Sequence, residues 1–308
     1  MPSTAPDASE RPRPGRHHPI DAWMLAVRPK TLPAAAASVV VGTALAAADG
    51  GFSPGPALAA LAIALLLQIG SNLANDVYDH ERGADTAERL GPVRVTQSGM
   101  LTRSQVKRGM KVVFALAFAL GLYLAYVRGP LVLAIGAAAI LSAYAYTGGP
   151  WPLGYHGLGE VFVFLFFGVT AVVGTYWVQT GAVTPLVWLM SLPVGFLITA
   201  IIVVNNLRDI EQDRAAGKRT VAVRIGAPAT RVEYLALVAL AYAVVAGAVI
   251  AGLLPPAGLA VFASLPLAYR ATRVVFTQVG RPLNGALAGT GQLSLAFGVL
   301  LALGLLIG

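Results

Sequence analysis

Two short stretches of the chain are rich in acidic and amide side chains, and each one closes a long apolar run. The first acidic stretch, residues 72–85, reads NLANDVYDHERGAD. On a helix, Asn72, Asp76 and Asp79 fall at i, i+4 and i+7, and Asn75 lies one turn before Asp79, so these side chains share one face. Carboxylate and amide oxygens are the ligands that Mg²⁺ prefers. The spacing therefore indicates a cation site at the end of an apolar helix.

The second acidic stretch, residues 205–213, reads NNLRDIEQD. Its Asn205, Asp209 and Asp213 recur at the spacing of one helical turn, so they too are expected on one face. Mg²⁺ usually takes one or two carboxylates from a protein and completes its shell with water and phosphate oxygens. Two faces with several carboxylates therefore predict more than one ion, bridged by a diphosphate group.

Basic side chains stand near both acidic stretches, as the binding of a diphosphate requires. We expect four of them to contact the diphosphate: Lys30, Arg94, Lys218 and Arg219. The alternative for each one is the excess of Lys and Arg that cytoplasmic loops of membrane proteins carry. The pair Gly217-Lys218 is not a P-loop, because the upstream glycine and the following Ser or Thr are missing.

Helices that span a membrane must position these residues, because 56% of the 308 residues are hydrophobic and only 12% are charged. The chain has no cysteine, which excludes disulfides and thiolate chemistry. We expect an all-α integral membrane protein, with residues 1–21 as a disordered cytoplasmic tail and residues 22–308 as a single transmembrane domain. Apolar runs predict nine spans, at about 32–48, 57–74, 106–127, 130–146, 158–178, 185–204, 232–254, 257–269 and 285–307.

The distribution of Lys and Arg predicts the orientation of these spans. With the N-terminus in the cytoplasm and the C-terminus outside, all of the 22 Lys and Arg residues except Arg128 fall on the cytoplasmic side. The net charge of +8 belongs mostly to this bias, and we expect no nucleic-acid partner. The acidic stretches follow the second and sixth spans, which predicts two four-helix pseudo-repeats plus one further helix. Such a bundle would place both acidic faces around one cavity.

Both acidic stretches resemble the two aspartate-rich signatures of the UbiA superfamily of intramembrane prenyltransferases. The second continues as NNLRDIEQDRAAGKRTVAVRIG, and the segment WMLAVRPKTLPAAAASVVVGTALA at 23–46 and the last span also fit, so the resemblance covers nearly the whole chain after Asp21. Within the superfamily the chain is similar to the MenA type, the 1,4-dihydroxy-2-naphthoate polyprenyltransferases. The 4-hydroxybenzoate branch usually has a third Asp where this chain has Gly83. Here the acid comes at Asp85, whose metal role stays open.

The resemblance implies nine transmembrane helices in a UbiA-like bundle, a cavity open to the lipid bilayer, and Mg²⁺ as cofactor. The implied reaction transfers a polyprenyl group from polyprenyl diphosphate to 1,4-dihydroxy-2-naphthoate in the cell (inner) membrane, with loss of CO₂ and diphosphate. Its product would be demethylmenaquinone, in menaquinone biosynthesis. Carried over by position, the metal ligands are Asn72, Asn75, Asp76, Asp79, Asp209 and Asp213, the four aspartates among them are catalytic, and Asn205 joins the diphosphate-binding residues.

Three further residues are candidates for contact with the acceptor or with an allylic carbocation. Tyr146 offers the face of an aromatic ring, although anchoring at the membrane interface explains it as well. Glu160 lies at the start of a span, where the helix dipole also favours an acid. Asp85 is the third.

Two other functions are compatible with parts of this pattern. A prenyltransferase for another aromatic acceptor, such as 4-hydroxybenzoate or homogentisate, would keep every motif. A transporter with a cytoplasmic cation gate would place acids near the middle of the bilayer. No predicted span carries an acid at its middle, which argues against transport. Dependence on Mg²⁺ with release of diphosphate separates the enzymes from the transporter.

Overall fold

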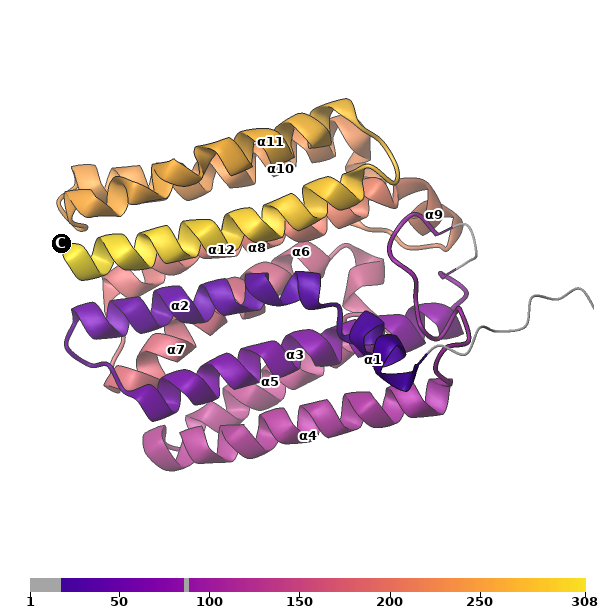
Figure 1. Ribbon diagram of the computed structural model, residues 1–308, viewed down its shortest axis with the longest axis horizontal. Helices are drawn as coiled ribbons and strands as arrows, with labels where there is room; N and C mark the ends of the chain where they lie inside the picture. The colour runs from indigo at the N-terminus through magenta and orange to yellow at the C-terminus, as the bar shows by residue number, and fades with distance from the viewer. Residues whose placement is uncertain (1–17, 86–88) are drawn as a thin grey trace, which may run out of the picture.

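The computed structural model describes residues 18–85 and 89–308, and every regular element in these residues is a helix. The long helices run side by side in one bundle (Figure 1). The α-helices are α1 Pro19–Val27, α2 Leu32–Ala48, α3 Pro54–Glu81, α4 Arg103–Arg128, α5 Leu131–Ala145, α6 Gly159–Val163, α7 Ala171–Thr180, α8 Pro185–Arg208, α9 Ile210–Ala215, α10 Val221–Ile250, α11 Leu265–Thr277 and α12 Leu283–Ile307. Tighter 3₁₀ turns form η2 Pro29–Thr31, η3 Leu153–His156 and η5 Pro256–Ser264, and η4 Phe164–Thr170 is a π-helix.

Eight helical segments among the described residues are long and apolar enough to cross a membrane. The protein is therefore a multi-pass membrane protein, as its composition predicts. The predicted span at 130–146 corresponds to α5, which has 15 residues and is shorter than the other spans. The predicted span at 257–269 is part of a longer segment, Pro256–Thr277, in which η5 continues into α11. The predicted nine spans thus appear as eight long segments and one short helix.

Of the expected tail, residues 1–21, the part up to residue 17 lies outside the described residues. Its last residues, 19–21, form the first turn of α1. Pro19 occupies the first position of this helix, where a missing N–H is harmless, and the side chain of His18 accepts a hydrogen bond from the backbone N–H of Ile20.

The centre of the bundle is α8, which packs against α10, α12 and η4. Pro193 lies inside α8, and Gly195 follows it. A Cβ atom built on Gly168 of η4 would lie 2.3 Å from the Cα atom of Gly195. This crossing therefore requires glycine, and it lets two backbones approach as small residues do in membrane helix packing.

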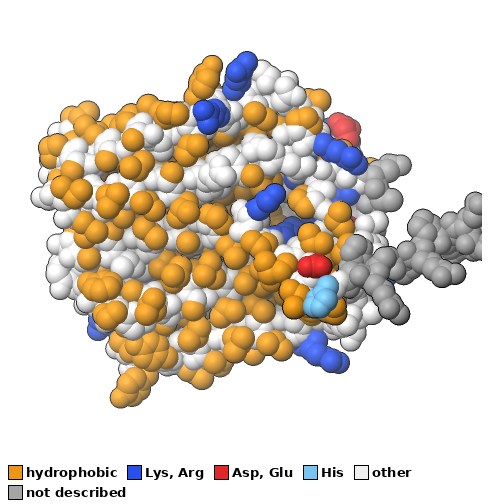
Figure 2. Space-filling view, viewed as in Figure 1, with side chains coloured by type: hydrophobic (Ala, Val, Ile, Leu, Met, Phe, Trp, Pro, Cys, Tyr) orange, Lys and Arg blue, Asp and Glu red, His pale blue; other side chains and the backbone are white. Residues whose placement is uncertain are grey.

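Polar segments gather at one end of the bundle. Helices α1 and α9 both lie at this end, which we call the polar end, and the C-terminus lies at the opposite end (Figure 1). On the face shown in Figure 2, hydrophobic side chains cover the length of the helices, and most charged side chains cluster towards the polar end. Arg128 ends α4 at the other end, where its guanidinium donates to the backbone oxygen of Val178 at 2.8 Å.

Candidate active site

The first acidic stretch forms the last turns of α3, and its acids have different partners. Asp76 accepts hydrogen bonds from two backbone N–H groups, those of Val95 at 3.1 Å and Thr96 at 2.9 Å. These amides belong to the loop that leads to α4. Asp76 is only 1% exposed. Its carboxylate therefore fixes the loop against α3, since a buried N–H without a partner is costly.

Asp79, one turn further along α3, faces cationic and hydroxyl groups instead. Its Oδ1 atom accepts hydrogen bonds from the Tyr155 hydroxyl at 2.9 Å and from the Lys218 ammonium at 3.0 Å. Its Oδ2 atom lies 3.3 Å from a guanidinium nitrogen of Arg94. The same ammonium lies 3.7 Å from Oδ1 of Asp213. Lys218 thus joins one acid from each acidic stretch, as the prediction of a shared site requires.

The second acidic stretch is not one continuous helix. Helix α8 ends at Arg208 and α9 begins at Ile210, with Asp209 between them at φ −101° and ψ 11°. The backbone N–H of Asp213 still donates to the oxygen of Asp209 at 2.8 Å, so the two remain about one turn apart. The predicted single helical face is therefore broken at its middle residue, and Asp213 lies on a separate short helix.

Arg208 holds the end of α8 in place. Its guanidinium donates to Asp209 at 2.7 Å, to Asn205 at 2.8 Å and to Asn284 of α12 at 2.7 Å. Asn284 in turn donates to the backbone oxygen of Leu90 at 2.9 Å. Arg208 is 3% exposed. This network connects α8, α12 and the loop after α3, and the spacing of acids in the sequence gave no sign of it.

Two amides of the first acidic stretch bind other parts of the protein. Asn72 donates to the backbone oxygen of Val27 and to the hydroxyl of Thr31, both at 2.9 Å, and so anchors the connection between α1 and α2. Asn75 accepts a hydrogen bond from the hydroxyl of Thr147 at 2.9 Å. Both amides were expected as metal ligands from the resemblance, and both have protein partners in the structure.

Burial changes the proton affinities of the acidic and basic groups outside the spans. Burial raises the pKa of Asp85 to about 6, although the charge of Arg89 opposes it. Burial also raises the pKa of Asp213 to about 7, against the charge of Lys218. For Lys218, burial alone would lower the pKa, but the charges of Asp79 and Asp213 outweigh it and raise the pKa. The ammonium therefore stays protonated between its two acids.

The predicted basic residues differ in position. Arg94 is buried and Lys218 contacts the acids, whereas Lys30 and Arg219 are exposed. Arg219 contributes through its backbone, whose N–H donates to the oxygen of Tyr155 at 2.8 Å.

Arg28 and Tyr155 are neighbours of the acids that spacing did not identify. Arg28 ends α1 with φ 54°, a left-handed conformation that is unusual for a residue with a side chain. The charges of Asp76, Asp79 and Asp85 act on its guanidinium. Residues held in a strained backbone conformation cluster at functional sites, and this conformation is visible only in the structure.

The remaining candidates, Tyr146 and Glu160, lie close to each other. A Cβ atom on Gly159, the neighbour of Glu160, would lie 2.8 Å from the hydroxyl oxygen of Tyr146. One carboxylate oxygen of Glu160 accepts a hydrogen bond from the side chain of Asn206 at 2.7 Å, and the other is buried with no hydrogen-bond partner among the described residues.

The donor set around Asp79 suits a divalent cation with a diphosphate. Among the described residues no group of three acidic or histidine side chains converges as a metal site, because the carboxylates face basic groups and backbone amides. All nearby candidate ligands are nevertheless oxygens, as Mg²⁺ prefers. The guanidinium Nε of Arg94 lies 3.2 Å from a carboxylate oxygen of Asp85, whereas its Nη1 is buried without a partner in the described part of the chain. A phosphate oxygen would supply one.

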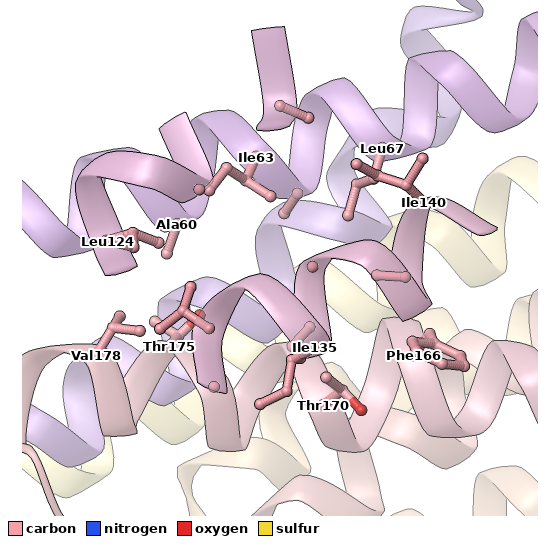
Figure 3. Close-up of a pocket in the computed structure, with 18 of the residues that line it drawn as sticks. Ala60, Ile63, Leu67, Leu124, Ile135, Ile140, Phe166, Thr170, Thr175 and Val178 are labelled. Carbon is pink, nitrogen blue, oxygen red and sulfur yellow. The ribbon is translucent and has the colours of Figure 1, made fainter. Parts of the chain in front are cut away.

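An apolar cavity lies within the bundle and extends towards the end opposite the polar end. Helices α2, α3, α4, α5 and α7 and the π-helix η4 line it. Figure 3 shows Leu67, Ile140 and Phe166 near one end and Ala60, Leu124 and Val178 near the other.

Comparison with known proteins identifies the family. The model of the UbiA prenyltransferase family matches residues 35–280. The chain belongs to the UbiA prenyltransferase family. This confirms the resemblance found in the two acidic stretches. As a UbiA prenyltransferase, the protein is an enzyme that transfers prenyl groups.

Two curated relatives of this UbiA prenyltransferase are named 1,4-dihydroxy-2-naphthoate octaprenyltransferase. The protein from Haemophilus influenzae is 40% identical over 297 residues, which cover 93% of this chain and 96% of the relative. The protein from Bacillus subtilis is 35% identical over 288 residues, with 92% of each chain covered. Among solved structures, a UbiA homologue from Archaeoglobus fulgidus bound to GPP and Mg²⁺ has a TM-score of 0.66 over 93% of this chain and 100% of its own, at 17% identity. The last similarity concerns the fold alone.

Proposed function

We propose that this UbiA prenyltransferase transfers a polyprenyl group from polyprenyl diphosphate to 1,4-dihydroxy-2-naphthoate, in a reaction that depends on Mg²⁺. The products are CO₂, diphosphate and the quinol form of demethylmenaquinone, a precursor of menaquinone. The observation that carries the proposal is the meeting of Asp79 and Asp213 at Lys218, beside an apolar cavity. Relatives that match more than nine tenths of the chain carry the corresponding name.

The carboxylates of Asp79, Asp85, Asp209 and Asp213 are the residues that would hold Mg²⁺. The bound ion would neutralise the negative charge that develops on the departing diphosphate. Asp76, which the resemblance also suggests as a ligand, acts here through its two hydrogen bonds to the loop before α4. Asp76 is thus a positioning residue, which holds the loop that carries Arg94.

Basic side chains of this chain bind the diphosphate oxygens. Arg94 offers its unpaired Nη1, and Lys218 offers an ammonium held between two acids. Arg28 adds a third positive charge from the end of α1. Lys30 and Arg219 are exposed near the same end of the bundle and attract the anionic donor before it binds.

The apolar cavity excludes water from the prenyl group while its bond to oxygen breaks. The C–O bond electrons leave with the diphosphate, and the allylic carbon then bonds to the ring carbon that carries the carboxylate. Loss of that carboxylate as CO₂ returns its bonding electrons to the ring and restores aromaticity. Tyr146, about one turn beyond Ala143 of the cavity lining, and the nearby Glu160 contact the acceptor. The polar end faces the cytoplasm. The N-terminus then lies on the cytoplasmic side of the cell membrane and the C-terminus on the outer side.

A membrane assay tests the function. The protein in liposomes receives Mg²⁺, a polyprenyl diphosphate and 1,4-dihydroxy-2-naphthoate labelled in its carboxylate, and both the prenylated product and labelled CO₂ are measured. We expect product from the wild type, none after chelation of Mg²⁺, and a loss of about 100-fold or more in Asp79→Asn and Asp209→Asn. Glu211→Gln is the matched control, because this acid of the second stretch is exposed and pairs only with Arg214 at 2.8 Å.

Each outcome decides a different part of the proposal. Prenylation of 4-hydroxybenzoate in place of the naphthoate would overturn the acceptor and keep the donor chemistry. Full activity in both aspartate variants, or in the presence of chelator, would overturn the metal site.

A further inference from the structure

Three glycines from three different helices face the same apolar cavity. They are Gly121 of α4, Gly136 of α5 and Gly174 of α7. A Cβ atom built on any of them would meet no other atom within 4 Å. Glycine in the middle of a helix is less favourable than alanine, because it adds backbone entropy to the unfolded chain. At these positions no neighbouring backbone requires glycine, so close helix packing does not explain it.

Other glycines in this bundle show what such packing looks like. A Cβ atom on Gly42 of α2 would lie 2.5 Å from the backbone oxygen of Val172, and one on Gly304 of α12 would lie 2.4 Å from that of Ala257. These two glycines permit contact between helices. The three cavity glycines instead preserve empty space, which points to an occupant.

The lining of the cavity comes within about one turn of the reaction site along α5. Ala143, at its polar end, lies about one turn before Tyr146 and Thr147, and Thr147 donates to Asn75 of the first acidic stretch. Gly136 lies about 15 Å from Tyr146 along the helix axis, at about 1.5 Å per residue. An isoprene unit adds four carbon–carbon bonds of about 1.5 Å in a zigzag, or about 5 Å of length. With the reacting carbon level with Tyr146, the third isoprene unit therefore reaches Gly136.

We propose that Gly121, Gly136 and Gly174 keep open the passage for the third and later isoprene units of the donor, and so make this site competent for long prenyl chains. The inference rests on the proposed function, because the prenyl diphosphate is the occupant. Its extended apolar chain matches the lining, in which Thr170 and Thr175 carry the side-chain hydroxyls. A side chain at any of the three positions narrows the passage at one depth and leaves the reaction site unchanged.

Donor length in glycine variants tests this inference. Gly121→Leu, Gly136→Leu and Gly174→Leu are compared with the wild type on geranyl diphosphate, which has two isoprene units, and on geranylgeranyl diphosphate, which has four. We expect the ratio of kcat/KM for the long donor over the short donor to fall about tenfold or more in each variant. Activity with geranyl diphosphate stays within about twofold of the wild type, since its chain ends before the glycines. Gly136→Ala gives a smaller change of the same sign.

Gly247→Leu is the matched control. Gly247 lies on the exposed face of α10, away from the cavity, and a Cβ atom there also meets nothing within 4 Å. In this variant the ratio of kcat/KM for the long donor over the short donor stays that of the wild type.

The outcomes separate this inference from the proposed function. A wild type that prenylates with neither donor would overturn the proposed function. A wild type active with both donors, together with an unchanged ratio in all three leucine variants, would overturn the role of the glycines alone. An equal loss with both donors would also overturn it, because the side chains would then act on the enzyme as a whole.

Discussion

The ammonium of Lys218 lies 3.0 Å from the carboxylate of Asp79, although 139 residues separate them in the chain. It is also 3.7 Å from Asp213. Two carboxylates from different helices thus share one positive charge, which offsets their repulsion in a partly dry environment. A bound cation would take over this task, and the lysine would then be available to a phosphate oxygen.

Replacement of Lys218 by methionine removes this charge and keeps the length of the side chain. We expect kcat/KM to fall about 100-fold or more, because a positive group beside the leaving diphosphate contributes several kcal/mol. Lys218→Arg retains part of the activity, since it keeps the charge but changes its geometry. Initial rates in liposomes provide the measurement, and Arg214→Met, a change at an exposed ion pair, is the control. A Lys218→Met enzyme with the wild-type rate would refute the role of the ammonium.

Asp76 has a different role from Asp79, and its substitution should affect stability. In Asp76→Ala the backbone amides of Val95 and Thr96 lose their acceptor, which costs about 2 kcal/mol or more. We expect a lower unfolding temperature in detergent and faster proteolysis of the loop at residues 89–102. Asp76→Asn keeps one acceptor oxygen, so its unfolding temperature should lie between those of the wild type and Asp76→Ala. Unchanged proteolysis in Asp76→Ala would show that the loop does not depend on this carboxylate.

Tyr155 contributes two separable contacts. Its hydroxyl donates to Asp79 at 2.9 Å, and its ring lies 4.7 Å from the ammonium of Lys218. Tyr155→Phe removes the hydroxyl alone and should lower kcat/KM about tenfold, since a hydrogen bond to a charged group contributes about 1.5 kcal/mol or more. Tyr155→Leu also removes the cation–π contact and should lower it further. Equal rates for the two variants would mean that the ring contributes nothing.

Arg28 offers a case in which stability and donor binding change in opposite directions. Its φ of 54° costs a residue with a side chain about 1 kcal/mol, and glycine relieves that strain. Arg28→Gly should therefore stabilise the protein in thermal unfolding and at the same time raise KM for the prenyl diphosphate. Arg28→Ala keeps the strain and should raise KM without the gain in stability. An unchanged KM in both variants would remove Arg28 from the diphosphate site.

Much of the fold follows from apolar run length. The predicted span at 32–48 coincides with α2, and both acidic stretches lie at one end of the bundle, as the distribution of Lys and Arg predicts. These features depend on composition and on local periodicity, which a sequence displays directly.

The partners of individual acids do not follow from spacing. Asp76 and Asp79 are about one turn apart on α3, yet one binds backbone amides and the other binds Lys218. Their partners come from a loop and from a segment far along the chain, so that only the folded bundle decides between a structural and a chemical role. The break of the second acidic stretch at Asp209 could not be predicted from the sequence for the same reason. Arg208, next to the break, donates a hydrogen bond to Asn284 on the last helix, which is far away in the chain.

The long separation between Asp79 and Lys218 has a consequence for biogenesis. While the chain is being synthesised, α3 leaves the ribosome well before Lys218, and its acid has no ammonium to pair with. Until then the carboxylate of Asp79 has to stay in the hydrated headgroup region, where water solvates its charge. Five of the eight long segments precede Lys218 in the chain, so the two groups can pair only after more than half of the bundle has been translated.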